Sequence, residues 1–245
     1  ASNLAFYNQG EKFPQMIVMN INASIDSVLL PTMSSVQDNR ERVKKMTRRA
    51  IKVSTYIMAP LMMGLAFCAN TIVELVLTDK WLFCVPFLQI FCITYMFYPI
   101  HTANLNAIKS LGRGDLFLRL EILKKIVGLA FLLSTMWFGV MAMAYSLLFV
   151  SVISQIINSW PNKKLLNYGY LEQLKDIIPG ILLAIGMGIC VYFISFFNLS
   201  NILILALQII VGAIIYIGVS AVLHVESFEY LIDILSSFFN KRRKE

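Results

Sequence analysis

The sequence predicts an all-α polytopic membrane protein with about seven transmembrane helices. Apolar residues make up 58% of the 245 residues and charged residues only 14%, whereas soluble domains carry about 25% charged residues. Long apolar segments recur along the chain, and all but two of the 21 Lys and Arg residues fall in every second connection between them. A soluble domain could not bury so much apolar surface, so these segments are expected to cross a bilayer.

Seven apolar segments follow one another, and each approaches the roughly 20 helical residues that a bilayer core requires. Their bounds are Phe13–Gln37, Ile51–Asn70, Leu82–Ala107, Ile122–Val140, Met141–Trp160, Ile177–Phe197 and Ile202–His224. We therefore expect a seven-span transmembrane bundle over residues 13–224, with residues 1–12 as an external connection before it.

The basic residues predict the orientation of the bundle. They cluster after the first segment (Arg40–Lys52), the third (Lys109–Lys125), the fifth (Lys163–Lys175) and the seventh (Lys241–Lys244), while Lys12 and Lys80 lie in the other connections. The positive-inside rule assigns the side that carries most Lys and Arg to the cytoplasm. The C-terminus is therefore expected to be cytoplasmic, and seven spans that begin outside suggest that an N-terminal part precedes them.

Residues 225–245 are expected to form a cytoplasmic interfacial helix with a basic tail. Phe228, Leu231, Leu235 and Phe238 fall on one helical face, and the sequence Lys-Arg-Arg-Lys follows at residues 241–244. An apolar face combined with basic residues is typical of a helix that lies in the membrane surface.

Composition also argues against several other classes of protein. The net charge of +7 does not predict a nucleic-acid partner, because the basic residues are separated by membrane segments. The four cysteines, Cys68, Cys84, Cys92 and Cys190, lie within or beside apolar segments without metal-ligand spacing, so we expect hydrophobic packing and no metal site. The chain has no P-loop and no HExxH motif, and we expect no enzymatic activity.

Polar residues within the first segment predict one hydrated helix face. Asn20, Ser24 and Ser27 recur at positions i, i+4 and i+7, and Asn22 and Asp26 form an adjacent i, i+4 stripe. Residues at this spacing share a face of a helix. Because lipid cannot satisfy such groups, this face is expected to meet a cavity or other helices.

Asp26 is the candidate ion site of this segment. It lies about 13 residues, or roughly 20 Å of helix, from the outer end, near the bilayer centre. An ionised Asp at that depth costs about 2.5–3.5 kcal/mol. Two interpretations remain open. Asp26 is either satisfied by neighbouring Asn and Ser residues, or it binds a coupling ion (a proton or sodium) or contacts a polar substrate.

The third and fifth segments carry further polar candidates. His101 and Asn104 share a face at i, i+3, and Gln155 and Asn158 lie on a polar face with Ser151. Three segments with hydrated faces predict a shared aqueous cavity. The alternative is interhelical hydrogen bonding, which contributes about 0.6 kcal/mol per bond on average.

Arg119, Lys124 and Lys125 lie near the cytoplasmic start of the fourth segment. One interpretation is that these long side chains extend to the membrane surface. The other is a basic mouth that attracts a phosphate-bearing head group, since cations at a cavity entrance concentrate anions.

Several motifs occur in order along the chain: Tyr7-Asn8-Gln9-Gly10, the run from Asn20 to Pro31, Lys80-Trp81 ahead of Val85-Pro86-Phe87-Leu88, the stretches His101 to Leu111 and Leu116 to Lys125, and Pro161-Asn162-Lys163-Lys164-Leu165-Leu166. Together they resemble bacterial lipid-linked oligosaccharide flippases of the Wzx type, within the multidrug/oligosaccharidyl-lipid/polysaccharide exporter superfamily. These patterns are diffuse, but their order and spacing cover nearly the whole chain.

The resemblance implies that the chain is the C-terminal half of a fourteen-span exporter in the bacterial inner (cytoplasmic) membrane. Such a protein would move undecaprenyl-diphosphate-linked oligosaccharide outward by alternating access, for O-antigen, capsule or exopolysaccharide biosynthesis. It would require no cofactor beyond a possible coupling gradient of protons or sodium. Its implied partners are the lipid-linked oligosaccharide, membrane lipids, the missing N-terminal half and polysaccharide polymerase machinery.

Three other functions remain open at the level of sequence. A multidrug exporter of the same superfamily predicts an apolar, aromatic-rich cavity with one or two acidic residues. A membrane-embedded glycosyltransferase or polymerase requires acidic residues on a sizeable domain outside the membrane, which the short connections do not provide. A membrane scaffold predicts that no lipid-linked sugar crosses. The polar faces of the first, third and fifth segments favour the oligosaccharide flippase.

Overall fold

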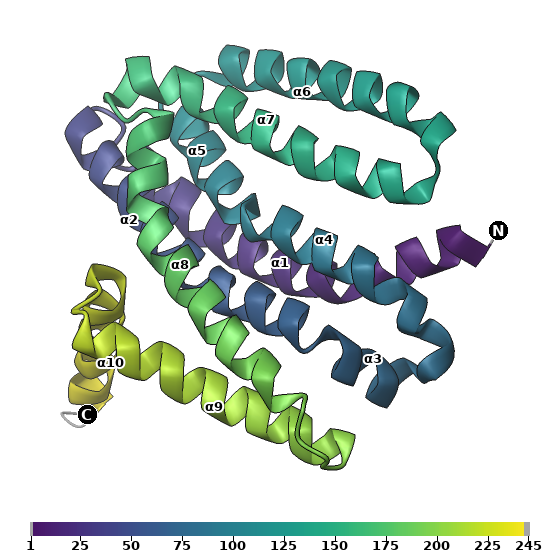
Figure 1. The fold of residues 1–245 in the computed structure, drawn as a ribbon. Helices are drawn as coiled ribbons and strands as arrows, with labels where there is room; N and C mark the ends of the chain where they lie inside the picture. Colours follow the sequence, from purple (N-terminus) through teal and green to yellow (C-terminus); the bar gives the residue numbers. More distant parts are fainter. Residues whose placement is uncertain (1, 243–245) are drawn as a thin grey trace.

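The computed structural model describes residues 2–242, in which the chain forms helices and no strand. Figure 1 shows a helical bundle whose helices diverge across the view instead of running parallel. Their bounds are α1 (Ser2–Ser34), α2 (Arg40–Phe67), α3 (Ala69–Leu77), η1 (Asp79–Cys84), α4 (Val85–Met96), α5 (Tyr98–Ser110), α6 (Gly114–Thr135), η2 (Met136–Phe138), α7 (Val140–Leu166), α8 (Tyr170–Ile194), α9 (Asn201–Val222) and α10 (Glu226–Arg242).

Six membrane-spanning candidates stand out by length and composition within the described residues. They are Asn3–Ser34, Arg40–Phe67, Asp79–Ser110, Val140–Leu166, Tyr170–Ile194 and Asn201–Val222. The expected fourth span corresponds to α6, which begins at Gly114 and has 22 residues. Its residues 119–125 include Arg119, Glu121, Lys124 and Lys125, so α6 has the length of a span without its uniformly apolar composition.

The structure corrects the expected boundary of the first span. Residues 2–12 were expected as a connection, but they continue the same helix as the apolar segment that follows. The side chains explain this continuity: Phe6 packs edge-on against Trp81 with ring centroids 5.7 Å apart, and Tyr7 packs against Phe87 at 5.9 Å. These contacts with η1 and α4 stabilise the first turns of α1.

The expected third span is divided into two helices. Helix α4 ends at Met96, α5 begins at Tyr98, and Phe97 lies between them. Pro99 occupies the first turn of α5, where its missing N–H costs no helical hydrogen bond, whereas the same residue inside a continuous helix would break the ladder. Tyr95 and Tyr98 therefore lie on opposite sides of the break, only three residues apart.

The basic connections lie together at one end of the bundle, which we call the basic end. Arg40 and Arg113 line the same small pocket, Arg113 and Lys164 line a second one, and Lys52 and Lys175 line a third. These residues come from the connections after the first, third and fifth expected spans. Their proximity confirms that alternate connections share one side of the bundle. The assignment of this side to the cytoplasm stays a prediction.

Apolar side chains fill the interior and also cover the outside. Met58, Met62, Leu88 and Phe91 are fully buried in the main core. On the outer helices, Ile209 and Ile214 of α9 and Leu182 of α8 expose about three-fifths of their surface, at 62%, 64% and 62%. A soluble protein rarely exposes contiguous apolar surface of this kind, so these faces are suited to contact with lipid.

Three of the four cysteines are buried, as expected for hydrophobic packing: Cys68, Cys84 and Cys92. The expectation is wrong for Cys190, which is exposed because it faces outward from α8 beside the apolar surface. Within the described residues, no group of three or more His, Cys, Asp or Glu side chains is arranged to hold a metal ion.

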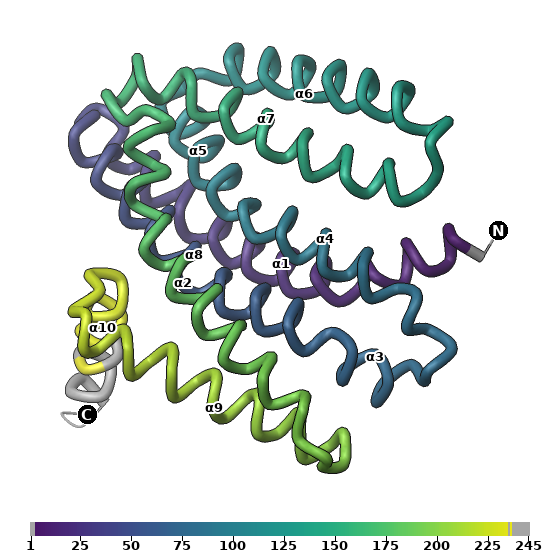
Figure 2. The backbone as a smooth tube through the Cα atoms, viewed as in Figure 1, coloured from purple at the N-terminus to yellow at the C-terminus, as the bar shows by residue number. Residues whose placement is uncertain are grey.

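Helix α10 forms where the interfacial helix was expected and lies next to the end of α9 and against α2 (Figure 2). Phe228 and Leu231 pack against the main core. The amine Nζ of Lys52 lies 2.5 Å from Oε2 of Glu226, and the guanidinium of Arg49 lies 4.3 Å from the centroid of the Tyr230 ring. The side chains of Leu235, Phe238, Lys241 and Arg242 are not described, and Arg243 and Lys244 lie outside the described residues.

Candidate functional site

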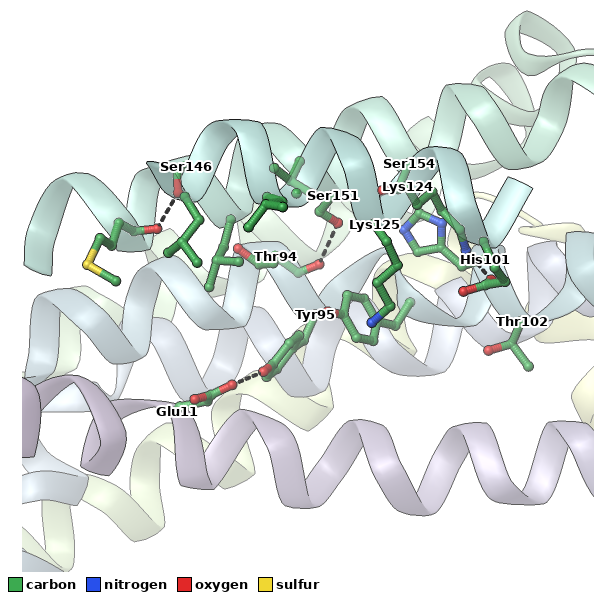
Figure 3. A pocket seen from close by; sticks show the side chains of 18 of the residues that line it. Glu11, Thr94, Tyr95, His101, Thr102, Lys124, Lys125, Ser146, Ser151 and Ser154 are labelled. Carbon is green, nitrogen blue, oxygen red and sulfur yellow. Dashed lines mark hydrogen bonds and ion pairs between the residues drawn. The ribbon is translucent and has the colours of Figure 1, made fainter. Parts of the chain in front are cut away.

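A cavity of about 700 Å³ lies between the α6–α7 hairpin on one side and α1, α4 and α5 on the other (Figure 3). Its polar lining consists of Tyr7, Glu11, Asn22, Thr94, Tyr95, Tyr98, His101, Thr102, Glu121, Lys124, Lys125, Ser146, Ser151 and Ser154. The expected first, third and fifth spans all contribute, which confirms that these three segments share one cavity. Helix α6 supplies a fourth wall.

The apolar part of the lining comes mainly from the α6–α7 hairpin, through Gly128, Leu129, Leu132, Met143, Leu147 and Val150, with Leu105 of α5. The cavity also extends along α1, since Glu11 and Asn22 both line it. Asn22 is eleven positions after Glu11, which corresponds to about 16 Å along the helix. The cavity is therefore elongated, with polar groups on α1, α4 and α5 and an apolar surface on the hairpin.

Two of the three basic candidates of α6 line the cavity. The Lys124 side chain is 16% exposed, and its Nζ lies 2.5 Å from Oε1 of Glu121. Lys125 also lines the cavity and has no ion pair with the described residues. Figure 3 shows it extending from α6 towards the tyrosines of the facing wall. Arg119 is exposed and lies outside the lining.

His101 lines the cavity and is held by Asn158 of α7. The Nδ2 atom of Asn158 lies 3.1 Å from Nδ1 of His101. Nδ2 belongs to an amide NH₂ group, so Nδ1 accepts this hydrogen bond and the proton of a neutral imidazole is then on Nε2. The His101 ring also packs edge-on against Tyr98, with centroids 5.7 Å apart. Asn158 itself is fully buried and is not part of the cavity lining, so it positions His101 from the side away from the cavity.

Asn104 does not reach the cavity and instead forms a buried amide cluster with Gln173 and Asn162. Asn104 Nδ2 donates to Gln173 Oε1 at 2.8 Å, and Asn104 Oδ1 accepts from Gln173 Nε2 at 2.9 Å and from Asn162 Nδ2 at 2.7 Å. All three side chains are completely buried. For Asn104 the geometry fits the interhelical hydrogen-bond interpretation, joining α5, α7 and α8.

The remaining candidates lie outside the cavity lining. Asn20 is exposed, and its Nδ2 donates to the backbone oxygen of Met16 at 2.8 Å. Gln155 is 2% exposed, and its Nε2 has no hydrogen-bond partner in the described part of the chain. Asp26 is exposed, and its Oδ1 accepts a 2.7 Å hydrogen bond from Nδ2 of Asn106. Of the polar candidates of α1, only Asn22 lines the cavity.

Glu11 lines the cavity and was not predicted from the sequence. It was placed in a connection because the apolar segment begins only at Phe13. Tyr7 and Glu11 stand at positions i and i+4, so they share a helical face. The hydroxyl group of Tyr95 on α4 donates a hydrogen bond to Oε1 of Glu11. The i, i+4 spacing of Tyr7 and Glu11 was the available signal, provided that the helix was extended towards residue 2.

A second group of charged residues, centred on Asp176, forms ion pairs between helices at the basic end. Arg48 Nε and Nη2 donate to the two carboxylate oxygens of Asp176, each at 2.7 Å, and Lys52 Nζ lies 3.5 Å from Oδ1. The hydroxyl of Tyr168, in the connection before α8, donates to Oδ2 of Asp176 at 2.8 Å. Burial, and secondly this hydrogen bond to a carboxylate, raise the pKa of Tyr168. This network fixes α2 against α8, away from the cavity.

Comparison with known proteins adds independent information. A family model described as polysaccharide biosynthesis protein matches residues 1–86. A membrane protein from the cps region of Klebsiella pneumoniae is 30% identical over 139 residues, 56% of this chain and 29% of that protein. The teichuronic acid biosynthesis protein TuaB of Bacillus subtilis (strain 168) is 21% identical over 89% of this chain and 46% of its own length.

The lipopolysaccharide biosynthesis protein WzxC of Escherichia coli (strain K12) is 21% identical over 75% of this chain and 39% of its own length. The chain thus spans less than half the length of these relatives. Among solved structures, the lipid II flippase MurJ in an inward closed conformation shares the fold, with a TM-score of 0.75 and 16% identity over 91% of this chain and 48% of MurJ. Together these findings confirm the resemblance to Wzx-type polysaccharide biosynthesis proteins that the sequence motifs predict, and the likeness to MurJ shows a shared fold.

Proposed function

We propose that this chain is the C-terminal half of a flippase that moves undecaprenyl-diphosphate-linked oligosaccharide across the bacterial inner membrane by alternating access, for surface polysaccharide biosynthesis. The observation that carries the proposal is the elongated cavity, which offers Lys124 and Lys125 on one wall and hydroxyl, amide and imidazole groups on the other. No bond is made or broken in this step. The lipid tail remains in the bilayer while the polar head group enters the cavity.

The chemistry of the lining supports an anionic, hydroxylated head group. A diphosphate accepts charge-assisted hydrogen bonds from ammonium groups, and Lys125 has no competing ion pair with the described residues. Sugar hydroxyls need several modest donors and acceptors, which Asn22, Thr94 and Ser154 supply from three different helices. The partners of the transporter are then membrane lipids, the N-terminal half and the polymerase that uses the delivered oligosaccharide.

The test of the proposed function reverses the charge of the two cavity lysines in the full-length parent. Lys124→Glu with Lys125→Glu should reduce movement of fluorescent undecaprenyl-diphosphate oligosaccharide across liposome membranes at least about tenfold, because two attractive contacts to phosphate become repulsive. The matched control is Lys45→Glu with Lys163→Glu, since both side chains are exposed outside the cavity. Equal transport by both double variants would contradict a head-group role for the cavity lysines.

Coupling to a proton or sodium gradient is a further part of the proposal, with Asp26 as the candidate site. An acidic residue within a membrane-spanning helix is a functional candidate by default, since an ionised group in lipid is unfavourable. The carboxylate is exposed and has a hydrogen bond from Asn106 but no ion pair with a described basic residue. A gradient biases the equilibrium between two conformational states only if the ion binds one state more tightly than the other. A carboxylate whose surroundings change between the two states would have such a difference in ion affinity.

One observation favours a second candidate, an exporter of cationic amphipathic molecules. The cavity contains Glu11 with Tyr7, Tyr95 and Tyr98 beside the apolar surface of the α6–α7 hairpin, and tyrosine faces attract cations. Lys124 and Lys125 argue against this candidate because they repel a cation in the same cavity. Transport of a fluorescent organic cation, but not of lipid-linked oligosaccharide, would favour it.

A further inference from the structure

Glu11 is a cavity carboxylate that no described basic residue neutralises. It lies on α1, half-buried, and lines the large cavity. Its Oε1 accepts a hydrogen bond from the hydroxyl group of Tyr95. Its neighbour Lys12 is engaged with Gln9, at 2.9 Å between Nζ and Oε1. A carboxylate has two oxygens and about four acceptor positions, so the single bond to Tyr95 leaves capacity for a ligand.

Aromatic rings surround this carboxylate and extend from it into the cavity. Tyr95 and Tyr98 pack edge-on with centroids 4.7 Å apart, and Tyr98 in turn contacts His101 at 5.7 Å. Tyr7 lies one helical turn before Glu11 and packs against Phe91 at 5.0 Å. These contacts fix the orientation of the rings. The wall therefore combines a carboxylate that accepts hydrogen bonds from hydroxyl groups with fixed aromatic rings, of which Tyr7 and Tyr98 are partly exposed and Tyr95 is buried.

We infer that Glu11, Tyr7, Tyr95 and Tyr98 form a carbohydrate subsite, separate from the phosphate-binding lysines, and so determine how the head group lies in the cavity. This inference rests on the proposed function and deepens it. A carboxylate accepts strong hydrogen bonds from hydroxyl groups, and the C–H face of a sugar ring packs on an aromatic surface as other apolar groups do. The sugar portion then lies against α1 and α4 while the diphosphate contacts α6.

The surroundings favour a hydroxylated ligand over an organic cation at this position. Lys125 extends from α6 across the same cavity (Figure 3), so a cation beside Glu11 would also experience its repulsion. Further hydroxyl groups lie on the facing wall: Ser146 and Ser154 line the cavity, and Ser151 donates to the backbone oxygen of Thr94 at 3.3 Å. A sugar-phosphate ligand satisfies both the free carboxylate and the free ammonium group.

The experiment measures binding of two probes to the full-length parent in nanodiscs: undecaprenyl diphosphate without sugar, and the same lipid carrying its oligosaccharide. Glu11→Gln and Tyr98→Leu should each weaken binding of the oligosaccharide lipid at least about tenfold, since a charged hydrogen bond or a stacking surface is lost. Both should leave binding of the sugar-free lipid within about twofold. Lys125→Gln should weaken binding of both probes.

Two matched controls replace the same residue types outside the cavity: Glu172→Gln and Tyr145→Leu, both at exposed positions. They should leave both affinities unchanged. Because Gln can still accept the Tyr95 hydroxyl, Glu11→Gln is expected to fold, and its thermal unfolding checks this directly.

The possible outcomes separate the inference from the function on which it rests. If the wild-type protein binds neither probe, the proposed function fails, and the subsite with it. If the wild-type protein binds both and Glu11→Gln weakens both equally or neither, the carbohydrate subsite alone is wrong. A third probe, the organic cation tetraphenylphosphonium, tests the alternative that Glu11 binds a cation. If Glu11→Gln lost binding of this probe but bound the oligosaccharide lipid as the wild-type protein does, the inference would be overturned.

Discussion

Asn106 on α5 donates a 2.7 Å hydrogen bond from its Nδ2 to Oδ1 of Asp26 on α1. Asp26, the ion site predicted from the sequence, therefore lies beside α5, the helix that contributes His101 to the cavity. Asp26 itself is not part of the cavity lining. Asp26→Asn preserves an acceptor for Asn106 and removes the charge. We expect this variant to fold with nearly unchanged thermal stability and to lose the stimulation of flipping by an imposed proton or sodium gradient.

Asn106→Ala is the complementary variant for Asp26. It removes the hydrogen bond and keeps the carboxylate, so stability should fall by roughly 1–2 kcal/mol while the response to the gradient remains. A full gradient response in Asp26→Asn would show that Asp26 has only a structural role.

Gly10 allows α1 to approach α4 closely. A Cβ atom at this position would lie 2.8 Å from the backbone nitrogen of Leu88 and 2.9 Å from the backbone oxygen of Cys84. Backbone atoms cannot move aside easily, so Gly10→Ala should force the helices apart and cost about 1–3 kcal/mol in the free energy of unfolding. Thermal unfolding in detergent measures the effect.

Gly186 provides the control for Gly10, because it lies in helix α8 and a Cβ atom there would meet nothing within 4 Å. Gly186→Ala should be neutral or stabilise the protein by up to about 1 kcal/mol, through helix propensity. If both substitutions had the same effect, close helix packing at Gly10 would not be the cause.

Asp176 holds three donors at the basic end. Its side chain is 6% exposed, whereas that of Arg48 is 48% exposed. Asp176→Ala leaves Arg48, Lys52 and Tyr168 without their shared acceptor, so we expect a loss of roughly 2–4 kcal/mol in the free energy of unfolding. Arg48→Met leaves Asp176 two other donors and should cost only about 1–2 kcal/mol. Chemical or thermal unfolding of the two variants should reproduce this order.

Arg42→Met tests whether loss of positive charge alone explains the effect at Arg48, since Arg42 is exposed at the start of α2. Its substitution should change stability by less than about 0.5 kcal/mol. A larger loss in Arg48→Met than in Asp176→Ala would contradict the role assigned to the carboxylate.

Tyr168 makes stability sensitive to alkaline pH. Burial and the hydrogen bond to Asp176 raise the pKa of Tyr168 above its ordinary value of 10.0. The unfolded chain therefore releases this proton near pH 10 while the folded chain retains it, so the folded state loses stability as pH rises above that value. Below pH 10 both states hold the proton, and this residue contributes no pH dependence.

Tyr168→Phe removes the ionisable group. The variant should be about 1–2 kcal/mol less stable at neutral pH, because a hydrogen bond to a charged acceptor is lost. Its stability should then fall less steeply than that of the wild-type protein between pH 10 and 11. Parallel stability curves for the two proteins would show that another group causes the alkaline loss.

Much of the fold follows from the sequence because membrane spans have a strong local signal. Apolar length identifies six of the seven expected spans, and the alternation of basic residues predicts which connections lie together, as Arg40, Arg113 and Lys164 do. The break at Phe97 was not predicted, because a proline in an apolar segment signals either a kink or a new helix start. The extent of α1 was also missed, since its first turns are stabilised by contacts with Trp81 and Phe87 from a distant segment.

The site was predicted only in part, for a related physical reason. Polar periodicity finds a face of a helix, but packing decides whether that face meets a cavity, a neighbouring amide or the outside. Asn22 and His101 reach the cavity, whereas Asn104 pairs with Gln173 and Asn20 bonds its own helix. Glu11 was missed because its role depends on Tyr95, 84 residues away in the sequence, which periodicity does not relate to it.

The measurement that tests the account most directly is transfer of fluorescent undecaprenyl-diphosphate oligosaccharide between the leaflets of liposomes that contain the full-length parent. A membrane-impermeant quencher reports how much lipid has reached the other leaflet. We expect transfer well above that in protein-free liposomes, and a reduction of at least about tenfold when Lys124 and Lys125 are both replaced by Glu. Transfer no faster than in protein-free liposomes would contradict the proposal that this protein is a flippase of lipid-linked oligosaccharide.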